Sequence, residues 1–216
     1  VHMMSLPKLT ADKQVGWWRE ELTIFKGVLE QNLGVTITDD KLREAVKTHN
    51  KTRRLLRQLY ELRKKPNPPI TGADTLAVVI ASTAMPREQF NKILAELLEE
   101  LKASEGTKDY KYRLMLVSSI LDDPSYVRVI EDLGGLVVTD SMCFGSRWFW
   151  ADVDEKEEDP LSALAKYYGV GQENIVDIIN ELAGDEQFTA LTSYRALWAA
   201  HGSSEEHQIL NSFYRE

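Results

Sequence analysis

Two short apolar runs with a helical segment between them restrict the fold of this chain more than any other feature. Residues 113–121 (RLMLVSSIL) and 136–140 (LVVTD) contain aliphatic and β-branched side chains and are too short for helices, so we interpret each as a buried strand. Between them, Asp123 and Pro124 suit an N-cap and a first helical position, and Gly134 suits a helix end. This order predicts a parallel βαβ unit with a right-handed crossover, and hence an α/β fold.

Helical periodicity dominates the rest of the sequence, so we predict a helix-rich α/β protein. Two amphipathic helices come first, and a stiff Pro-rich connector, residues 66–72 (PNPPITG), follows them. Two more helices are expected after the connector, the second beginning at Pro86. We therefore divide the chain into an N-terminal helical segment (1–65), the connector, an α/β core (73–170) and C-terminal helices (171–216).

Several helix starts and helix faces can be predicted residue by residue. Thr38 is expected to cap the second helix, and Asp159 with Pro160 marks the start of a later one. In the helix that begins at Pro86, the apolar residues are expected to face inward: Phe90, Ile93, Leu94, Leu97, Leu98 and Leu101. Three short helices are expected after residue 170, and the apolar residues of the second are Phe188, Leu191, Leu197 and Trp198.

Composition and charge exclude several classes of protein. The formal net charge is −8 and the sequence contains no basic block, which argues against a nucleic-acid-binding protein. No apolar run reaches the ~20 residues that span a bilayer, so we predict no membrane segment and a cytoplasmic location. The single cysteine cannot form an internal disulfide. Residues 1–4 (VHMM) resemble a vector remnant.

The loop after the second apolar run holds the candidate functional residues, which are Asp140, Cys143, Gly145, Ser146 and Arg147. In open α/β sheets, ligands bind at the carboxyl ends of the strands, so these residues are expected to lie on the functional face. Backbone N–H groups at a helix start beside Arg147 would suit a phosphate or carboxylate. The alternative, which the spacing alone favours, is that Ser146 caps the helix and Arg147 pairs with Asp140 or Asp152.

Cys143 has three possible roles, as an iron or zinc ligand, as a nucleophile, or as a small buried side chain. A four-iron cluster needs about three or four thiolates, and this chain has one cysteine. The histidines show no metal-ligand spacing, since even His201 and His207 lie six apart across an expected helix boundary; the others are His2 and His49. We therefore expect no complete metal site, and the sequence identifies no base for a nucleophile.

The aromatic residues Trp148, Phe149 and Trp150 could roof an apolar pocket or anchor their short helix to the sheet, and anchoring is the commoner role. Asp122 and Asp123 could be paired catalytic carboxylates, but helix capping explains them more simply. The sequence contains no GxGxxG, P-loop, GxSxG or HExxH motif. The residues alone thus indicate an α/β domain with a site at the strand ends and no assigned reaction.

The central stretch LDDPSYVRVIEDLGGLVVTDSMCFGSRWFW, followed by DPLSALAKYY, resembles the subunits of 2-hydroxyacyl-CoA dehydratases and benzoyl-CoA reductases. The resemblance covers about residues 17–168. It implies an acyl-CoA substrate, a related second subunit, a [4Fe-4S] cluster in the full-length protein, and an ATP-dependent activator that delivers one electron. Reduction of the thioester carbonyl then gives a ketyl radical. In the family pattern, residues 143–147 lie on the cluster and substrate side.

The cluster cysteines of the family lie in other segments, and these are missing from the present sequence, whose tail after Tyr168 also departs from the family. Two interpretations remain. The first is a fragment or subunit of a radical-type dehydratase or reductase that retains affinity for the CoA thioester near Ser146 and Arg147. The second is a non-catalytic scaffold or subunit-pairing module. In either case we expect no cofactor and no activity in this chain alone.

Overall fold

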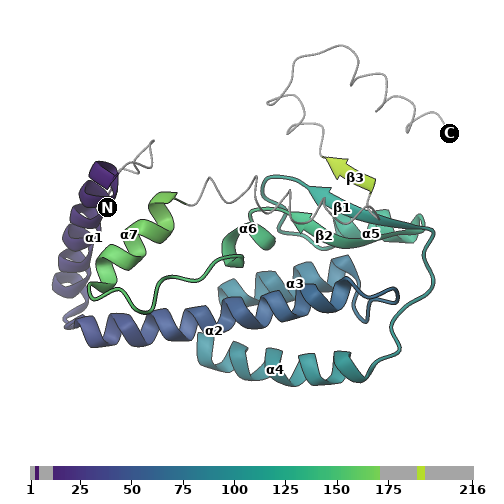
Figure 1. Cartoon of the computed structure of the whole chain (residues 1–216), viewed down its shortest axis with the longest axis horizontal. Coiled ribbons are helices and arrows are strands. Elements are labelled where there is room, and N and C mark those ends of the chain that lie inside the picture. Colours follow the sequence, from purple (N-terminus) through teal and green to yellow (C-terminus); the bar gives the residue numbers. More distant parts are fainter. Residues whose placement is uncertain (1–2, 5–11, 171–188, 193–216) are drawn as a thin grey trace, which may run out of the picture.

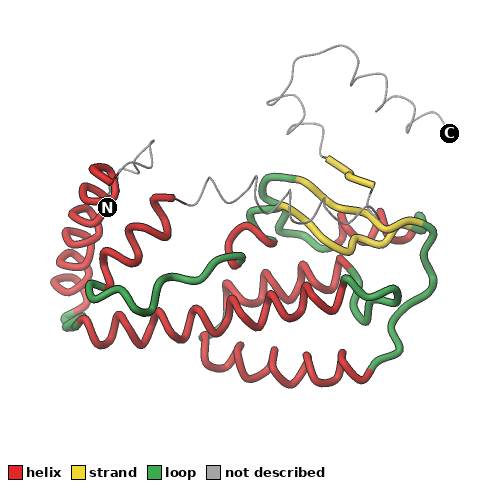
Figure 2. The backbone as a smooth tube through the Cα atoms, in the orientation of Figure 1, coloured by secondary structure: helices red, strands yellow, loops and turns green. Residues whose placement is uncertain are grey.

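The structure is a computed structural model that describes residues 3–4, 12–170 and 189–192 (Figure 1). In chain order, its helices and strands are α1 (Asp12–Leu33), α2 (Asp39–Arg63), α3 (Gly72–Ala84), α4 (Arg87–Ala103), β1 (Tyr112–Val117), α5 (Ser125–Asp132), β2 (Gly135–Ser141), α6 (Ser146–Phe149), α7 (Pro160–Val170) and β3 (Thr189–Thr192). Figure 2 shows that helices form most of the described chain and that the strands lie together at one end. The predicted helix-rich α/β class is confirmed.

The sheet has the strand order β2-β1-β3, and β1 is parallel to both neighbours. The predicted βαβ unit is therefore confirmed, with α5 as its crossover helix. All residues of β2 are buried, as expected for a parallel strand covered by helices. Strand β1 ends at Val117, earlier than the predicted residue 121. The Ser118 amide still donates to the Ser141 carbonyl, but beyond it the chain leaves the hydrogen-bond ladder between β1 and β2.

Strand β3 contradicts the prediction of a helix that includes Leu191. Residues 189–192 instead pair in parallel with Leu114–Val117 of β1. Two physical reasons favour the strand: threonine is β-branched and suits extended backbone, and the free edge of β1 offers backbone groups that need partners. The other expected C-terminal helices lie outside the described residues.

The helix starts follow the predicted capping signals. The Thr38 hydroxyl accepts a hydrogen bond from the Lys41 amide at the start of α2. The Asp123 carboxylate accepts the Ser125 amide at the start of α5, and this backbone hydrogen bond lowers the pKa of Asp123. Helix α5 begins at Ser125, one residue later than predicted. Asp123 thus binds a free amide of the first turn as predicted, but the residue directly before the helix is Pro124 and not Asp123.

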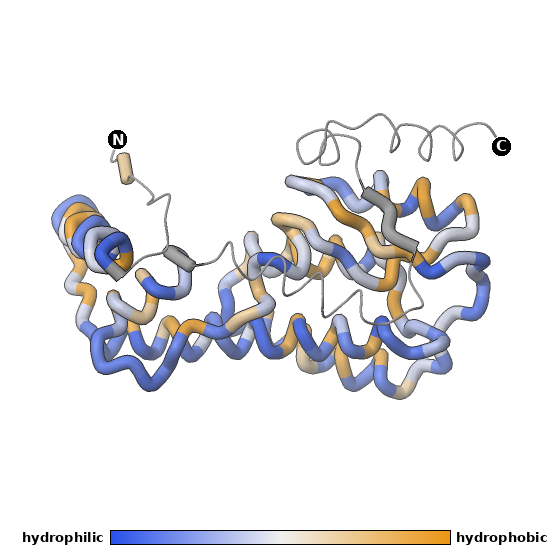
Figure 3. Tube along the Cα trace, turned by 45° about the horizontal axis from the view of Figure 1, so that its top comes forward, coloured by the Kyte–Doolittle hydropathy of each residue, from blue (hydrophilic) through white to orange (hydrophobic). Residues whose placement is uncertain are grey.

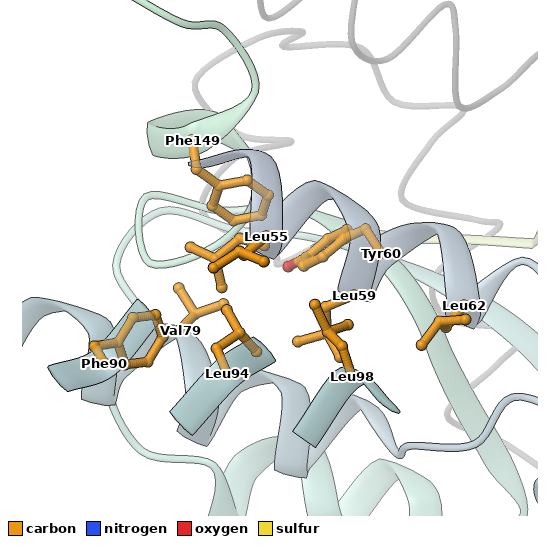
Figure 4. Close-up of a cluster of buried hydrophobic side chains, with 10 residues drawn as sticks. Leu55, Leu59, Tyr60, Leu62, Val79, Phe90, Leu94, Leu98 and Phe149 are labelled. Atoms are coloured by element: carbon orange, nitrogen blue, oxygen red, sulfur yellow. The ribbon is translucent and has the colours of Figure 1, made fainter. Parts of the chain in front are cut away.

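A helical core joins α2, α3, α4 and α6 (Figure 4). Its buried residues are Leu55, Leu56, Leu59, Tyr60, Leu62, Val79, Phe90, Leu94, Leu98 and Phe149. Helix α4 contributes a narrow strip with a spacing of four residues, and Ile93 lies off it with 45% of its surface exposed, so the inward position predicted for Ile93 is wrong. Each fully buried aliphatic side chain here stabilises the fold by roughly 1.5–3 kcal/mol.

A second apolar cluster holds the sheet against the helices. It comprises Ala73, Leu76, Leu116, Val127, Val137 and Met142, from α3, β1, α5, β2 and the loop after β2. Figure 3 shows the corresponding pattern, since hydrophobic residues gather along the strands while the long helices alternate between hydrophilic and hydrophobic positions. The sheet is thus fixed in place relative to α3 and α5.

At the end of the molecule far from the sheet, α1 packs against α7 (Figure 1).

The Pro-rich connector is held by later residues, because the Tyr110 hydroxyl donates to the Pro66 carbonyl and the Thr107 amide donates to the Pro68 carbonyl. The division of the chain at residues 66–72 stays a prediction. Among the helices that the structure describes, none combines the length and apolar character needed to cross a membrane.

Candidate functional site

The loop between β2 and α6 lies at the carboxyl ends of the parallel strands (Figure 1). The chain leaves β1 toward β2 on one side, whereas β3 pairs on the other side of β1. Such a reversal of direction defines the switch point where open α/β sheets bind ligands. The Arg147 guanidinium reaches this point, because its Nη2 atom donates to the Ser118 carbonyl immediately after β1. The predicted loop and the strand ends are therefore close together.

Asp140 organises the loop from inside the protein. The residue is 2% exposed, and its carboxylate accepts hydrogen bonds from the Ser146 amide at 2.9 Å and from the Tyr60 hydroxyl. Arg63 lies 3.4 Å from the same carboxylate and forms a buried ion pair with it. The prediction that Arg147 pairs with Asp140 or Asp152 is wrong. The partners of Asp140 come from α2 and from the loop backbone, and Asp152 pairs with Arg54 and Arg57.

Tyr60 and Arg63 surround this carboxylate on the side of α2. Burial raises the pKa of Tyr60 well above its ordinary value, and the neighbouring Asp140 raises it further, so the hydroxyl stays protonated and donates. The Arg63 guanidinium lies 4.4 Å from the centroid of the Tyr60 ring and donates from Nη2 to the Val137 carbonyl. Its Nε atom is buried and has no hydrogen-bond partner. These contacts fix the carboxylate between α2 and β2.

Gly145 allows the loop to approach Asp140 closely. A Cβ atom at this position would lie 1.9 Å from Asp140 Oδ1, which no side chain can tolerate without displacing the carboxylate. The absence of a side chain at Gly145 therefore lets the Ser146 amide reach Asp140. The sequence identified Gly145 as part of the site, and the geometry supplies the reason.

Ser146 is completely buried, and its hydroxyl donates to the backbone carbonyl of Asp140 at 2.6 Å. It makes no capping hydrogen bond at the start of α6, so the prediction that Ser146 caps the helix is wrong. Its amide is also occupied, because Asp140 accepts it. Ser146 thus closes the loop. Its side chain is buried and already hydrogen-bonded, so it does not support direct contact with a ligand.

Arg147 and Cys143 form the outward part of the loop. Arg147 donates from Nε to Ser141 Oγ and from Nη2 to the Ser118 and Ser141 carbonyls, which fixes the plane of the guanidinium. Its Nη1 atom lies 3.7 Å from the Cys143 sulfur. Cys143 is exposed, so the alternative of a small buried side chain is wrong. A fixed cation beside an exposed thiol is the accessible chemistry of this loop.

The residues present do not fit an iron–sulfur cluster. A four-iron cluster takes about three or four thiolates, whereas Cys143 is the one cysteine of the 216 residues. Within residues 3–4, 12–170 and 189–192, no three side chains of the types His, Cys, Asp and Glu gather in a metal-binding group. A cluster at this edge would need thiolates from polypeptide other than these residues.

The aromatic residues after Arg147 anchor α6, as predicted, but mainly to the helical core around α2. Phe149 is fully buried, and its ring meets Tyr60 edge to face at 4.9 Å (Figure 4). Trp148 and Trp150 pack against the same cluster. Phe149 therefore packs in the core and does not roof a ligand pocket.

Sequence reasoning placed neither Arg63 nor Tyr60 in the candidate site. One signal was present: Leu56, Leu59, Tyr60 and Arg63 follow the i, i+3, i+4, i+7 pattern, so an arginine continues the apolar face of α2. A buried arginine requires a partner, but the sequence does not say which carboxylate supplies it. Folding brings Asp140 to this position from 77 residues away.

A parallel sheet with a braced loop at its strand ends is an α/β arrangement, and open α/β sheets place their ligand sites at this edge. A family model described as 2-hydroxyglutaryl-CoA dehydratase, D-component, matches residues 1–191. The chain therefore belongs to this family, which confirms the resemblance seen in residues 17–168. The match continues as far as residue 191, so the prediction that the chain departs from the family directly after Tyr168 is wrong.

Curated relatives agree with this family. The chain is 31% identical over 185 residues to the putative dehydratase subunit YjiM of Escherichia coli, covering 79% of this chain and 46% of the relative. It is 27% identical over 152 residues to the beta subunit of (R)-2-hydroxyglutaryl-CoA dehydratase from Acidaminococcus fermentans (70% and 40%). Identity to a benzoyl-CoA reductase subunit from Thauera aromatica is 27% over 151 residues (69% and 39%). The chain spans less than half the length of these relatives, each of which is a subunit by name.

Proposed function

We propose that this chain forms part of a subunit of an enzyme that dehydrates or reduces an acyl-CoA thioester. The named relatives support a CoA thioester, because they include a 2-hydroxyglutaryl-CoA dehydratase, a benzoyl-CoA reductase and a lactoyl-CoA dehydratase. The observation that carries the proposal is the Arg147 guanidinium, which is held at the carboxyl edge of the sheet by the Ser118 and Ser141 carbonyls. A fixed guanidinium suits a phosphate or carboxylate group of such a substrate.

Within this proposal, the described residues bind and orient. Arg147 holds an anionic group of the substrate, while Asp140, Tyr60 and Arg63 keep the loop backbone in place. In the whole enzyme, an iron–sulfur cluster and an ATP-dependent activator would supply electrons, as the family resemblance implies. Since these 216 residues lack the thiolates, we assign the cluster to other polypeptide of the subunit or to a second, related subunit.

The test is the affinity of the Arg147→Gln variant for 2-hydroxyglutaryl-CoA, measured by titration calorimetry. Loss of a charged hydrogen bond should weaken binding by about 1.5–3 kcal/mol, or roughly 10- to 100-fold in the dissociation constant. Arg128→Gln is the matched control, because Arg128 is exposed, pairs with Asp74 and lies outside the loop. An unchanged dissociation constant for Arg147→Gln would refute the proposal.

A second function, that of a non-catalytic scaffold or pairing module, is favoured by the count of one cysteine in the sequence. Iron and acid-labile sulfide should be measured on protein purified without oxygen, alone and after co-expression with a related subunit. Iron on this chain alone would contradict the scaffold and show that Cys143 shares a cluster between copies. Iron only in the co-purified complex would support a partner that carries the cluster.

A further inference from the structure

Arg53 differs from the other arginines of α2 in having no carboxylate partner. The other four each form an ion pair. Arg43 pairs with Asp40, and Arg63 pairs with Asp140. Arg54 pairs with Asp152 and Glu155, and Arg57 pairs with Asp152. Arg53 forms none among the described residues, although it is 3% exposed. A buried charge without a counter-charge is costly, so the environment of Arg53 requires an explanation.

The contacts of Arg53 hold its guanidinium in one orientation. Nη1 donates to Asn50 Oδ1 at 3.1 Å, and Nε donates to the Tyr167 hydroxyl at 3.2 Å. The guanidinium carbon lies 4.7 Å from the centroid of the Tyr167 ring. These neutral partners use Nε and one Nη1 hydrogen, and no described residue accepts from Nη2. Arg53 therefore retains donors for a further oxyanion.

A second arginine without a carboxylate partner among the described residues, Arg87, lies in the same region. Arg87 is half-buried, and its guanidinium lies 5.4 Å from the centroid of the Trp148 ring, whose backbone carbonyl accepts the Tyr167 hydroxyl. Arg87 donates from Nη1 to the Ser82 carbonyl, and it forms no ion pair within the described chain. Burial and the charge of Arg53 both lower the pKa of Arg87.

His49 completes the group from α2. Burial lowers the pKa of His49, and the charges of Arg87 and Arg53 lower it further, while Glu88 opposes this effect. Its surroundings therefore favour the neutral imidazole, which can donate one ring N–H. His49 lies one turn before Arg53 on α2, and the Asn91 side-chain amide donates to the Thr48 carbonyl, which holds the start of α4 beside this part of α2. Two guanidinium groups, an imidazole and two flanking aromatic rings therefore lie around the same stretch of α2.

We propose that Arg53, Arg87 and His49 form an anion site that binds a phosphate group. Two fixed positive charges match a phosphate, which carries about −1.5 to −2 charges at neutral pH and several acceptor oxygens. Guanidinium groups suit such planar, multiple hydrogen bonding better than other cations. Asp152 and Glu155, two acids that contact α2, are already paired with Arg54 and Arg57, and no other carboxylate of the described residues pairs with Arg53 or Arg87.

This site shares no residue with the loop of Asp140 to Arg147, so separate substitutions can test it and the proposed acyl-CoA site. Its ligand is defined here by chemistry alone, as inorganic phosphate or the phosphate group of a small molecule. The two sites make separable predictions: a charge-removing change at Arg87 should affect phosphate binding alone, whereas a change at Arg147 should affect only the CoA thioester.

The test is the melting temperature of the 216-residue chain titrated with sodium phosphate against sodium chloride at equal ionic strength. Wild type should show a saturable rise, and Arg87→Gln should need at least about tenfold more phosphate for the same rise, since it loses a charged hydrogen bond. Arg54→Gln is the matched control, because it removes the same charge from α2 but from an arginine paired with Asp152 and Glu155.

Several outcomes would overturn the site. These are the absence of a saturable rise in wild type, an unchanged response in Arg87→Gln, or an equal loss in Arg54→Gln, which would indicate screening. Arg53→Gln is a second variant of the site. Because Arg53 is buried, the Arg53→Gln protein could fail to fold, and the result for Arg87→Gln then decides whether the site exists. Weakened binding of 2-hydroxyglutaryl-CoA by Arg87→Gln would show that the two sites are one and would refute a separate site.

Discussion

At the scale of single residues, Asp140 determines the conformation of the candidate loop. It connects the Ser146 amide to Tyr60 and Arg63, two residues of α2. The pair with Arg63 is almost completely buried, so water cannot compensate either charge if its partner is removed. A buried pair adds little net stability as such, but loss of one member is severe.

We predict that Asp140→Ala lowers the free energy of unfolding by about 3–5 kcal/mol, because it leaves Arg63 buried without its counter-charge. Urea denaturation followed by tryptophan fluorescence measures this difference. Asp40→Ala is the matched control: Asp40 also pairs with an arginine of α2, but its side chain is 91% exposed, so little change is expected. Similar losses in the two variants would contradict a special role for Asp140.

Gly145 offers a second test at this scale. Gly145→Ala should lower the free energy of unfolding by about 1–3 kcal/mol, because the new Cβ displaces Asp140 and leaves the Ser146 amide unsatisfied. In Gly16→Ala the new Cβ meets nothing within 4 Å, and Gly16 lies inside α1. That control should be neutral or more stable by up to about 1 kcal/mol. A Gly145→Ala protein as stable as wild type would show that the loop does not need this close approach.

At the scale of elements, Asp159 joins the start of α7 to α1. Its carboxylate accepts from the Leu161 amide and the Ser162 hydroxyl, and it forms an ion pair with Arg19. Burial by itself raises the pKa of Asp159, but the hydrogen bonds from Ser162, Arg19 and Leu161 together lower it. The folded state therefore favours the ionised carboxylate.

The lowered pKa predicts a pH dependence of stability. The contribution of Asp159 should be complete above its ordinary pKa of 3.8 and should be lost as the pH falls through the lower value of the folded state. The difference in unfolding free energy between wild type and Asp159→Asn should thus shrink between about pH 5 and pH 2. Urea denaturation at several pH values measures it, and a constant difference would contradict the assignment.

Elements were predictable where local chemistry decides. Thr38 and Asp159 provide capping oxygens, so the starts of α2 and α7 follow from the sequence. Strand β3 did not follow, because Leu191 is compatible with either a helix or a strand and only the free edge of β1 favours the strand. The same competition explains Ile93, whose helix was correct while its side chain lies outside the strip that contacts α2.

At the scale of the whole molecule, α2 connects the sheet end to the end formed by α1 and α7 (Figure 1). Its last turn holds Asp140 through Arg63, and an earlier turn carries Arg53 and His49. The candidate acyl-CoA edge and the proposed phosphate site thus both depend on one helix. Changes in the position of α2 would therefore affect both sites together.

The sequence by itself determined the βαβ unit, the helix starts, the loop of Asp140 to Arg147 and the family, because these depend on residues that are near neighbours along the chain. Only the tertiary structure decided the partners: Asp140 with Tyr60 and Arg63, Arg147 with the Ser118 carbonyl, and Arg53 with Tyr167. Those pairs join residues 29 to 114 positions apart. Their choice depends on how buried charges find compensation in the packed molecule, which no local pattern encodes.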